Sequence, residues 1–139
     1  MKIQCERQRQ GGKSASVPTE AQEQRDLFRW IAYNTRKYPE LGLCFHVPNG
    51  GSRHPYEAHN LKEQGVKPGV PDICLPVARG PYHALYIELK RQKGGRVSED
   101  QRAWLGALTR AGNKAVVCRG WDEARKEIEN YLRMEQKED

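Results

Sequence analysis

Two carboxylates and a lysine lie where two neighbouring strands are predicted to meet. Asp72 follows Pro71 at the start of one strand, and Glu88-Leu89-Lys90 ends the next. Carboxylates on adjacent strands can hold a hard cation such as Mg²⁺, with water and a phosphate filling the other octahedral positions. Lys90 shares a strand face with Glu88, so its amine could orient or deprotonate a bound water, or offset charge growing on phosphorus. The pattern indicates a metal site for phosphate chemistry.

Gln101 follows in the first turn of the next predicted helix, and two interpretations of it remain open. With Ser98 three residues earlier it forms a capping-box pattern, which is a local structural role. It also shares the inward face of that helix with Trp104, Leu105 and Leu108, the predicted buried stripe, so it could serve the metal site.

The elements that position these residues follow from capping signals, apolar periodicity and breaks at proline or glycine. The predicted fold class is α/β, in the order α-β-α-β-β-α-β-α. The ranges are a helix over residues 19–38, a strand over 43–47, a helix over 55–64, strands over 72–77 and 84–90, a helix over 98–112, a strand over 115–118, and a helix capped by Asp122 with Ala124, Ile128, Tyr131 and Leu132 inward.

The strand over residues 84–90 has clean two-residue alternation. One face carries Leu85, Ile87 and Leu89, and the other carries Tyr86, Glu88 and Lys90. We expect the apolar face to be buried and the carboxylate and ammonium to emerge together at the strand end.

Composition limits the class of protein. The 139 residues include 24 Lys and Arg against 18 Asp and Glu, a net charge of +6, and the mean hydropathy is −0.92. We expect a flexible basic arm over residues 1–17, one domain over 18–133 and a charged tail over 134–139. Since no apolar run approaches about 18 residues and residues 1–16 are polar, we expect an intracellular protein without membrane span or signal peptide.

The four cysteines do not form a metal-binding pattern. Cys5, Cys44, Cys74 and Cys118 are widely spaced, without C-x-x-C. The last three lie in short apolar runs, so we interpret them as core residues rather than as ligands of a structural zinc.

The residues above, taken together, resemble the virus-type replication-repair nuclease (VRR-Nuc) family of the PD-(D/E)xK superfamily over residues 18–125. The similarity lies in Gly69-Val70-Pro71-Asp72, Tyr86-Ile87-Glu88-Leu89-Lys90 and Ser98-Glu99-Asp100-Gln101. It implies a restriction-endonuclease-like core, a central mixed sheet flanked by helices, and DNA cleavage with Mg²⁺ or Mn²⁺. Asp72, Glu88 and the backbone carbonyl of Leu89 would bind metal, Lys90 would act on the attacking water, and Gln101 would orient Lys90 or a phosphate.

A glutamate in the first helix usually completes such a site, and Glu20 and Glu23 are both available. We favour Glu20, because at about 100° per residue it lies within about 20° of Leu27 and Ile31 and faces the core, whereas Glu23 lies about 60° away. Glu23 remains the alternative.

Basic residues gather around these motifs. Residues 79–119 contain nine Lys and Arg and three Asp and Glu, and residues 120–139 contain four against seven. Such a stretch is typical of phosphate contact, although part of it can be ordinary solubilising charge. The candidate DNA-binding residues are Asn49, Arg53, Lys67, Arg91, Lys93 and Arg96.

The resemblance and the small size favour a homodimeric endonuclease acting on branched, Holliday-junction-like DNA in replication, recombination or repair. A non-catalytic DNA-binding module of the same fold, a flap nuclease and a restriction-type nuclease are the alternatives.

Overall fold

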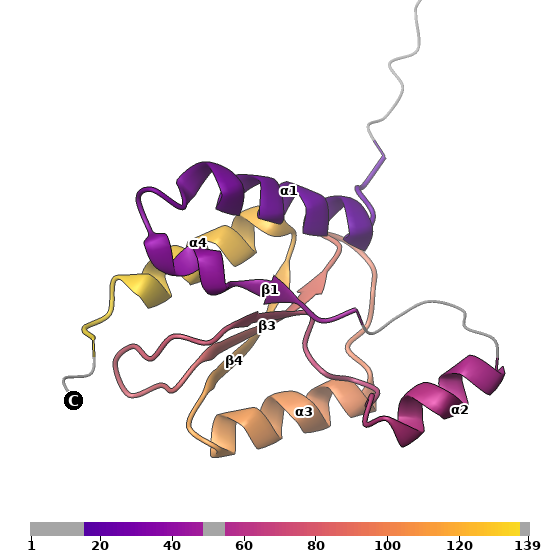
Figure 1. Ribbon diagram of the computed structural model, residues 1–139. Helices are drawn as coiled ribbons and strands as arrows, with labels where there is room; N and C mark the ends of the chain where they lie inside the picture. The colour runs from indigo at the N-terminus through magenta and orange to yellow at the C-terminus, as the bar shows by residue number, and fades with distance from the viewer. Residues whose placement is uncertain (1–15, 49–54, 137–139) are drawn as a thin grey trace, which may run out of the picture.

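A four-stranded mixed sheet forms the centre of the protein (Figure 1). The structure, a computed structural model, describes residues 16–48 and 55–136. The strands are β1 (Phe45–His46), β2 (Ile73–Leu75), β3 (Leu85–Lys90) and β4 (Lys114–Arg119), in that spatial order. The β1–β2 and β2–β3 pairs are antiparallel and the β3–β4 pair is parallel. The predicted mixed sheet and the order of the helices and strands are confirmed.

Helices cover both faces of the sheet. In Figure 1, α1 (Glu20–Asn34) and α4 (Trp121–Leu132) lie together on one face, and α3 (Glu99–Arg110) lies on the other. The short helix α2 (Pro55–Glu63) lies off the end of the sheet, near the start of α3. Because α3 connects the parallel strands β3 and β4, it crosses the sheet face that α1 and α4 leave open.

The main core lies between β3 and the α1–α4 pair. Leu85, Ile87 and Leu89 are buried, as their alternation predicts. They belong to one cluster with residues of both helices, including Leu27, Ile31, Ala124, Ile128, Tyr131 and Leu132. The inward residues predicted for the last helix are therefore confirmed, as are Leu27 and Ile31 of the first helix, whereas Phe28 and Trp30 are only partly buried.

The polar face of β3 differs from the prediction. Glu88 and Lys90 are only 2% and 6% exposed, so they do not emerge into solvent. The reason is that β3 is an inner strand, Gln101 at the start of α3 lies against Glu88, and Glu20 of α1 approaches Lys90. Alternation within one strand cannot reveal these contacts. On α3, Trp104, Leu105 and Leu108 are only half-buried, contrary to the expected buried stripe.

The strand predicted over residues 43–47 is shorter in the structure. A 3-10 helix, η1 (Pro39–Leu43), occupies its start, which leaves only Phe45–His46 paired in β1. Pro39 favours this turn because its fixed φ suits the first position of a helix. The preceding helix α1 also ends earlier than predicted, at Asn34, where side chains of Asn34 and Thr35 bond carbonyls one turn back.

Asp122 was wrongly predicted to cap the last helix. The helix starts at Trp121, and Gly120 occupies the cap position. Asp122 instead pairs with Arg125 and Lys126. A carboxylate from another helix accepts the hydrogen bond of the Trp121 amide, so the cap is tertiary rather than local.

The cysteine prediction holds for the residues that the structure describes. Cys74 and Cys118 are buried and Cys44 is half-buried, and all three are free thiols. Burial raises the pKa of Cys44 and of Cys118 to about 12, which keeps both protonated. Cys5 and residues 1–15 of the predicted arm lie outside the described residues, as do residues 137–139 of the tail. Within the described ranges, no helix is long and apolar enough to cross a membrane.

Candidate active site

Asp72 is held rigidly at the entrance of β2. Its Oδ2 accepts a hydrogen bond from the Leu89 amide at 2.8 Å. Its main-chain carbonyl accepts one from the Val47 amide at 2.7 Å and faces His46 Nδ1 at 2.8 Å. Because Ile73 pairs with Ile87, Asp72 and Glu88 occupy the next opposed positions of the two strands. The predicted pairing of these carboxylates across adjacent strands is therefore present.

Glu88 is buried and only partly satisfied. Its Oε1 accepts a hydrogen bond from Gln101 Nε2 at 2.8 Å and lies 3.4 Å from Lys90 Nζ. Its Oε2 is buried and has no hydrogen-bond partner within the described part of the chain. Burial, and then the charge of Asp72, raise the pKa of Glu88 to about 8, although Lys90 acts in the opposite direction. A cation bound beside Glu88, in addition to Lys90, would therefore favour the ionised form of this carboxylate.

Gln101 makes the local capping contacts and also reaches Glu88. Its Oε1 accepts from the Ser98 amide at 2.9 Å while the Ser98 hydroxyl accepts from the Gln101 amide at 3.1 Å, which completes the capping box. The Nε2 of the same side chain donates to Glu88. The capping geometry thus fixes the carboxamide that holds Glu88, and the two interpretations are not exclusive.

Lys90 lies between two carboxylates. Its Nζ is 3.4 Å from Glu88 Oε1 and 3.9 Å from Glu20 Oε1. Its main-chain carbonyl accepts a hydrogen bond from the Gly120 amide at 2.8 Å, which ties the end of β3 to the start of α4. Both the backbone and the side chain of Lys90 are therefore held in place.

The two first-helix glutamates have opposite environments, and the angular argument misjudged both. Glu23 is fully buried, with Oε1 bonded by Gln92 Nε2 at 2.8 Å and Oε2 by the Trp121 amide at 2.7 Å. The Glu20 side chain is 48% exposed and reaches Lys90. The angular argument assumed that only the side of α1 that carries Leu27 and Ile31 is buried. In the structure α4 packs beside α1 and buries a second side of this helix, on which Glu23 lies.

A cleft of about 440 Å³ opens beside Asp72. It is lined by Glu20, Ala21, Gln24, Arg25, His46, Pro48, Asp72 and Leu89. Sequence reasoning did not single out Gln24, Arg25 or His46. Their types are common on exposed surfaces, and only the tertiary structure brings the start of α1 to the same cleft as His46 and Asp72. Glu88, Lys90 and Gln101 are not among the residues that line this cleft.

The donor set fits a divalent cation in part. The unpartnered Oε2 of Glu88 and the carboxylate of Asp72 are hard oxygen donors of the kind Mg²⁺ prefers. No group of three His, Cys, Asp or Glu side chains in the described ranges is arranged to hold a metal. Mg²⁺ commonly takes only one or two protein carboxylates and keeps waters and substrate phosphate, so a two-carboxylate site is compatible with it.

The predicted DNA-binding residues fall into three groups. Lys67, Lys93 and Arg96 are exposed. Arg91 is half-buried and donates to the Val17 carbonyl at 3.3 Å, so part of its role is structural. Asn49 and Arg53 lie outside the described residues. Arg119 was not among the predicted residues. It supports the loop between β3 and α3, which carries Lys93 and Arg96, by donating to the Gly94 carbonyl at 2.8 Å.

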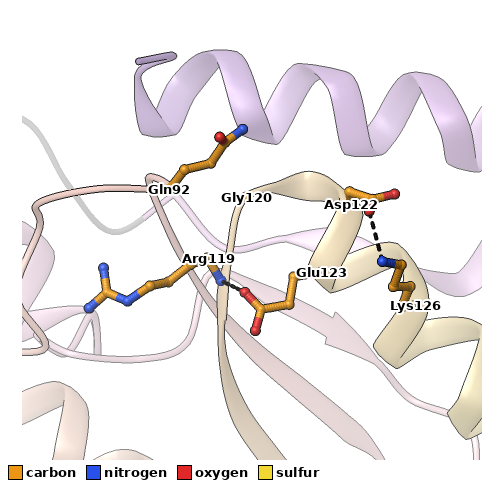
Figure 2. A pocket seen from close by; sticks show the side chains of 6 residues that line it. All are labelled: Gln92, Arg119, Gly120, Asp122, Glu123 and Lys126. Carbon is orange, nitrogen blue, oxygen red and sulfur yellow. Dashed lines mark hydrogen bonds and ion pairs between the residues drawn. The ribbon is translucent and has the colours of Figure 1, made fainter.

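A second hollow, of about 530 Å³, lies at the start of α4 (Figure 2). Its charged side chains have partners in the surrounding framework, and the Arg119 guanidinium donates to the Gly94 and Gly95 carbonyls. Glu123 Oε2 accepts from the Arg119 amide at 2.6 Å, and Lys126 Nζ lies 3.2 Å from Asp122 Oδ2. The Asp122 and Lys126 side chains turn toward each other in Figure 2. The hollow therefore belongs to the framework behind Lys90 and has none of the features of the first cleft.

The sequence and the fold were each compared with those of known proteins, and both comparisons find the same domain. A sequence profile of the VRR-NUC domain matches residues 18–122. A solved structure described as a "VRR_NUC domain protein" superposes with a TM-score of 0.74 and 28% sequence identity, over 87% of this chain and 93% of that one. No curated protein sequence matches the chain.

Proposed function

The chain belongs to the VRR-NUC domain family of nuclease domains, and from that premise we propose that it is an intracellular, Mg²⁺-dependent endonuclease that hydrolyses phosphodiester bonds in branched DNA. Mn²⁺ is expected to substitute for Mg²⁺. The observation that supports this most directly is the tethered Glu88, which has one oxygen bonded by Gln101, a lysine at 3.4 Å and a second, buried oxygen without a partner in the described ranges.

Asp72 and Glu88 would hold the cation, with the backbone carbonyl of Leu89 as a proposed further ligand. Glu20 forms no three-carboxylate group with them in the described ranges, so its carboxylate, 3.9 Å from Lys90 Nζ, would have to move to become the further ligand proposed for it. A bound divalent cation supplies Lewis acidity toward a phosphoryl oxygen and lowers the pKa of water. The raised pKa of Glu88 agrees with this role, because a carboxylate that burial makes costly to ionise gains most from a neighbouring cation.

The remaining groups position the reactants. Lys90 Nζ, which lies between Glu88 and Glu20, would orient the attacking water or offset negative charge that develops on the phosphoryl oxygens. Gln101 Nε2 holds Glu88 Oε1, which leaves the other oxygen for the cation. The Leu89 amide holds Asp72 in the same way.

DNA binding would use the exposed basic residues around this site. Lys67, Lys93 and Arg96, with Arg91, Asn49 and Arg53, are the proposed phosphate contacts. We further propose a homodimer, because a two-fold pair of such small domains can make symmetric cuts in a four-way junction.

Cleavage of labelled linear duplex, flap, splayed-arm and four-way-junction DNA tests the proposal, with Mg²⁺, Mn²⁺ or EDTA. Wild type is compared with Lys90→Ala and with Lys126→Ala, a control that removes an exposed lysine paired with Asp122. We expect metal-dependent cutting, fastest on the junction, that Lys90→Ala abolishes and Lys126→Ala preserves.

The other outcomes separate the alternatives. Preference for flaps, or sequence-specific cutting of linear duplex, would replace the junction substrate with a flap or restriction-type one. Absence of cutting on every substrate, with salt-sensitive DNA binding retained, would favour the non-catalytic binding module.

A further inference from the structure

The cleft beside Asp72 contains two donors that the proposed reaction does not use. Gln24 and Arg25, consecutive residues of α1, line the same cleft as Glu20, Asp72 and Leu89. Gln24 Nε2 is buried and has no hydrogen-bond partner among the described residues. Arg25 is exposed and makes no ion pair within the described ranges. Both side chains therefore have unused donors at the wall of the site.

Comparable side chains on the same helix have found partners. Gln22 Nε2 donates to Asp26 Oδ1 at 3.1 Å, and Arg29 lies 3.5 Å from the same oxygen. Buried polar atoms in folded proteins are nearly always hydrogen-bonded, so an unpartnered amide at the edge of a cleft indicates a missing acceptor. Gln24 and Arg25 differ from Gln22 and Arg29 in lining the cleft, which places that acceptor inside it.

The charge of the cleft narrows the chemistry of this acceptor. Glu20 and Asp72 make one part of the wall acidic, which suits a cation, whereas Arg25 adds a positive charge farther along α1. A group that accepts hydrogen bonds from a carboxamide and a guanidinium, and bridges toward a cation at Asp72, is an anionic phosphate. The volume of about 440 Å³ admits such a group with its adjoining sugar.

We propose that Gln24 and Arg25 form a phosphate subsite that holds non-bridging oxygens of the DNA strand as it passes Asp72. The subsite rests on the proposed nuclease function and adds to it the residues that align the strand. The Gln24 carboxamide turns about its last side-chain bond to present Nε2 to the phosphate, and Arg25 supplies the charge. Neither residue takes part in the bond-breaking step.

Binding without cleavage tests the subsite separately from catalysis. The affinity of the full chain for fluorescein-labelled four-way-junction and linear duplex DNA is measured by anisotropy in EDTA, across a salt series. Arg25→Ala should weaken binding about tenfold and reduce the salt slope by about one phosphate, since each neutralised phosphate contributes about 0.9 to that slope. Arg29→Ala removes the same charge from the same helix and should change binding less than about twofold.

Gln24→Leu gives a readout that a purely structural residue would not give. It removes an unpartnered donor and keeps the size of the side chain, so the thermal midpoint should stay the same or rise. The KM for cleavage should increase several-fold with kcat little changed, because the phosphate contact is made before and during the reaction alike. Gln22→Leu, which loses a satisfied hydrogen bond, is the matched control and should leave KM unchanged.

The outcomes separate this proposal from the nuclease proposal. If wild type cleaves DNA and the Arg25 and Gln24 variants behave like their controls, the subsite is wrong and the nuclease assignment stands. If no metal supports cleavage but Arg25→Ala still weakens binding selectively, the subsite stands without catalysis. Absence of DNA binding by wild type would overturn it.

Discussion

Oε2 of Glu23 on α1 lies 2.7 Å from the main-chain nitrogen of Trp121, the first residue of α4. The other oxygen of Glu23 accepts from Gln92, two residues beyond Lys90. One buried carboxylate therefore joins the first helix, the end of β3 and the start of the last helix. The Gly120 amide, next to Trp121, in turn holds the Lys90 carbonyl. Glu23 is occupied by this framework, which leaves Glu20 as the first-helix carboxylate near Lys90.

Glu23→Ala should destabilise the fold strongly. It leaves the Trp121 amide and the Gln92 carboxamide without their acceptor, and the loss of a buried charged partner costs on the order of 3 kcal/mol. Glu23→Gln should cost less, because its carbonyl can still accept from Trp121. Urea denaturation measures both, with Glu57→Ala on the exposed α2 as a control expected within about 0.5 kcal/mol of wild type. A Glu23→Ala protein as stable as that control would contradict the framework role.

Stability should fall as pH rises in the absence of metal. The pKa of Glu88 is raised from 4.5 to about 8 in the fold, so between these values the folded state keeps a proton that the unfolded chain has released. The stabilisation is complete below about pH 4.5 and is lost as pH rises through about 8, with an expected size on the order of 5 kcal/mol.

Glu88→Gln should flatten this pH dependence, because its side chain does not titrate and its carbonyl can still accept from Gln101. Thermal melts in EDTA from pH 5 to 9 would measure the effect, on a scale of about 3 °C per kcal/mol. Parallel curves for wild type and Glu88→Gln would show that another group carries the pH dependence.

The two roles of Gln101 should separate by mutation. Gln101→Glu keeps an oxygen that accepts from the Ser98 amide but replaces the donor to Glu88 with a second carboxylate, so the helix cap survives and cleavage should fall at least tenfold in kcat. Ser98→Ala should lower stability and leave cleavage intact. It removes the hydroxyl half of the cap at a cost of about 1 kcal/mol. The backbone amide at position 98 still bonds Gln101 Oε1, so the contact with Glu88 remains. Single-turnover cleavage and denaturation are measured for both variants. If the two variants lower the cleavage rate and the stability to the same extent, the helix cap is the only role of Gln101.

Gly69 should not tolerate a side chain. Its φ is +86°, and an added Cβ would lie 2.5 Å from the Asp100 carbonyl carbon in the first turn of α3. Gly69→Ala must displace either the Pro71-Asp72 segment or the turn that carries Gln101, and should cost on the order of 3 kcal/mol together with most of the activity.

Gly65→Ala is the matched control for Gly69→Ala. Its φ is similar, at +96°, but an added Cβ has no described atom within 4 Å. It should cost only about 1 kcal/mol and leave cleavage intact. Equal losses at the two positions would mean that backbone conformation, and not the contact with Asp100, limits Gly69.

Much of the candidate site could be predicted from local sequence patterns. Alternation identified Glu88 and Lys90 as neighbours on one face, and a proline before Asp72 located the start of the adjacent strand. The Ser98 and Gln101 spacing predicted the capping box that the structure contains. These inferences succeeded because each depends on residues within about one turn or one strand of each other.

The sequence by itself determined the order of the elements, the carboxylate pair on neighbouring strands and the lysine beside it, because short-range geometry dictates them. Only the tertiary structure decided that Glu23 is buried and Glu20 is open, that Glu88 has a raised pKa, and that Gln24 and Arg25 line a cleft. The Glu23 and Trp121 contact joins residues 98 positions apart, and the buried Glu88 is held by Gln101 from the start of α3. Such contacts depend on how whole elements pack, which no local pattern in the chain specifies.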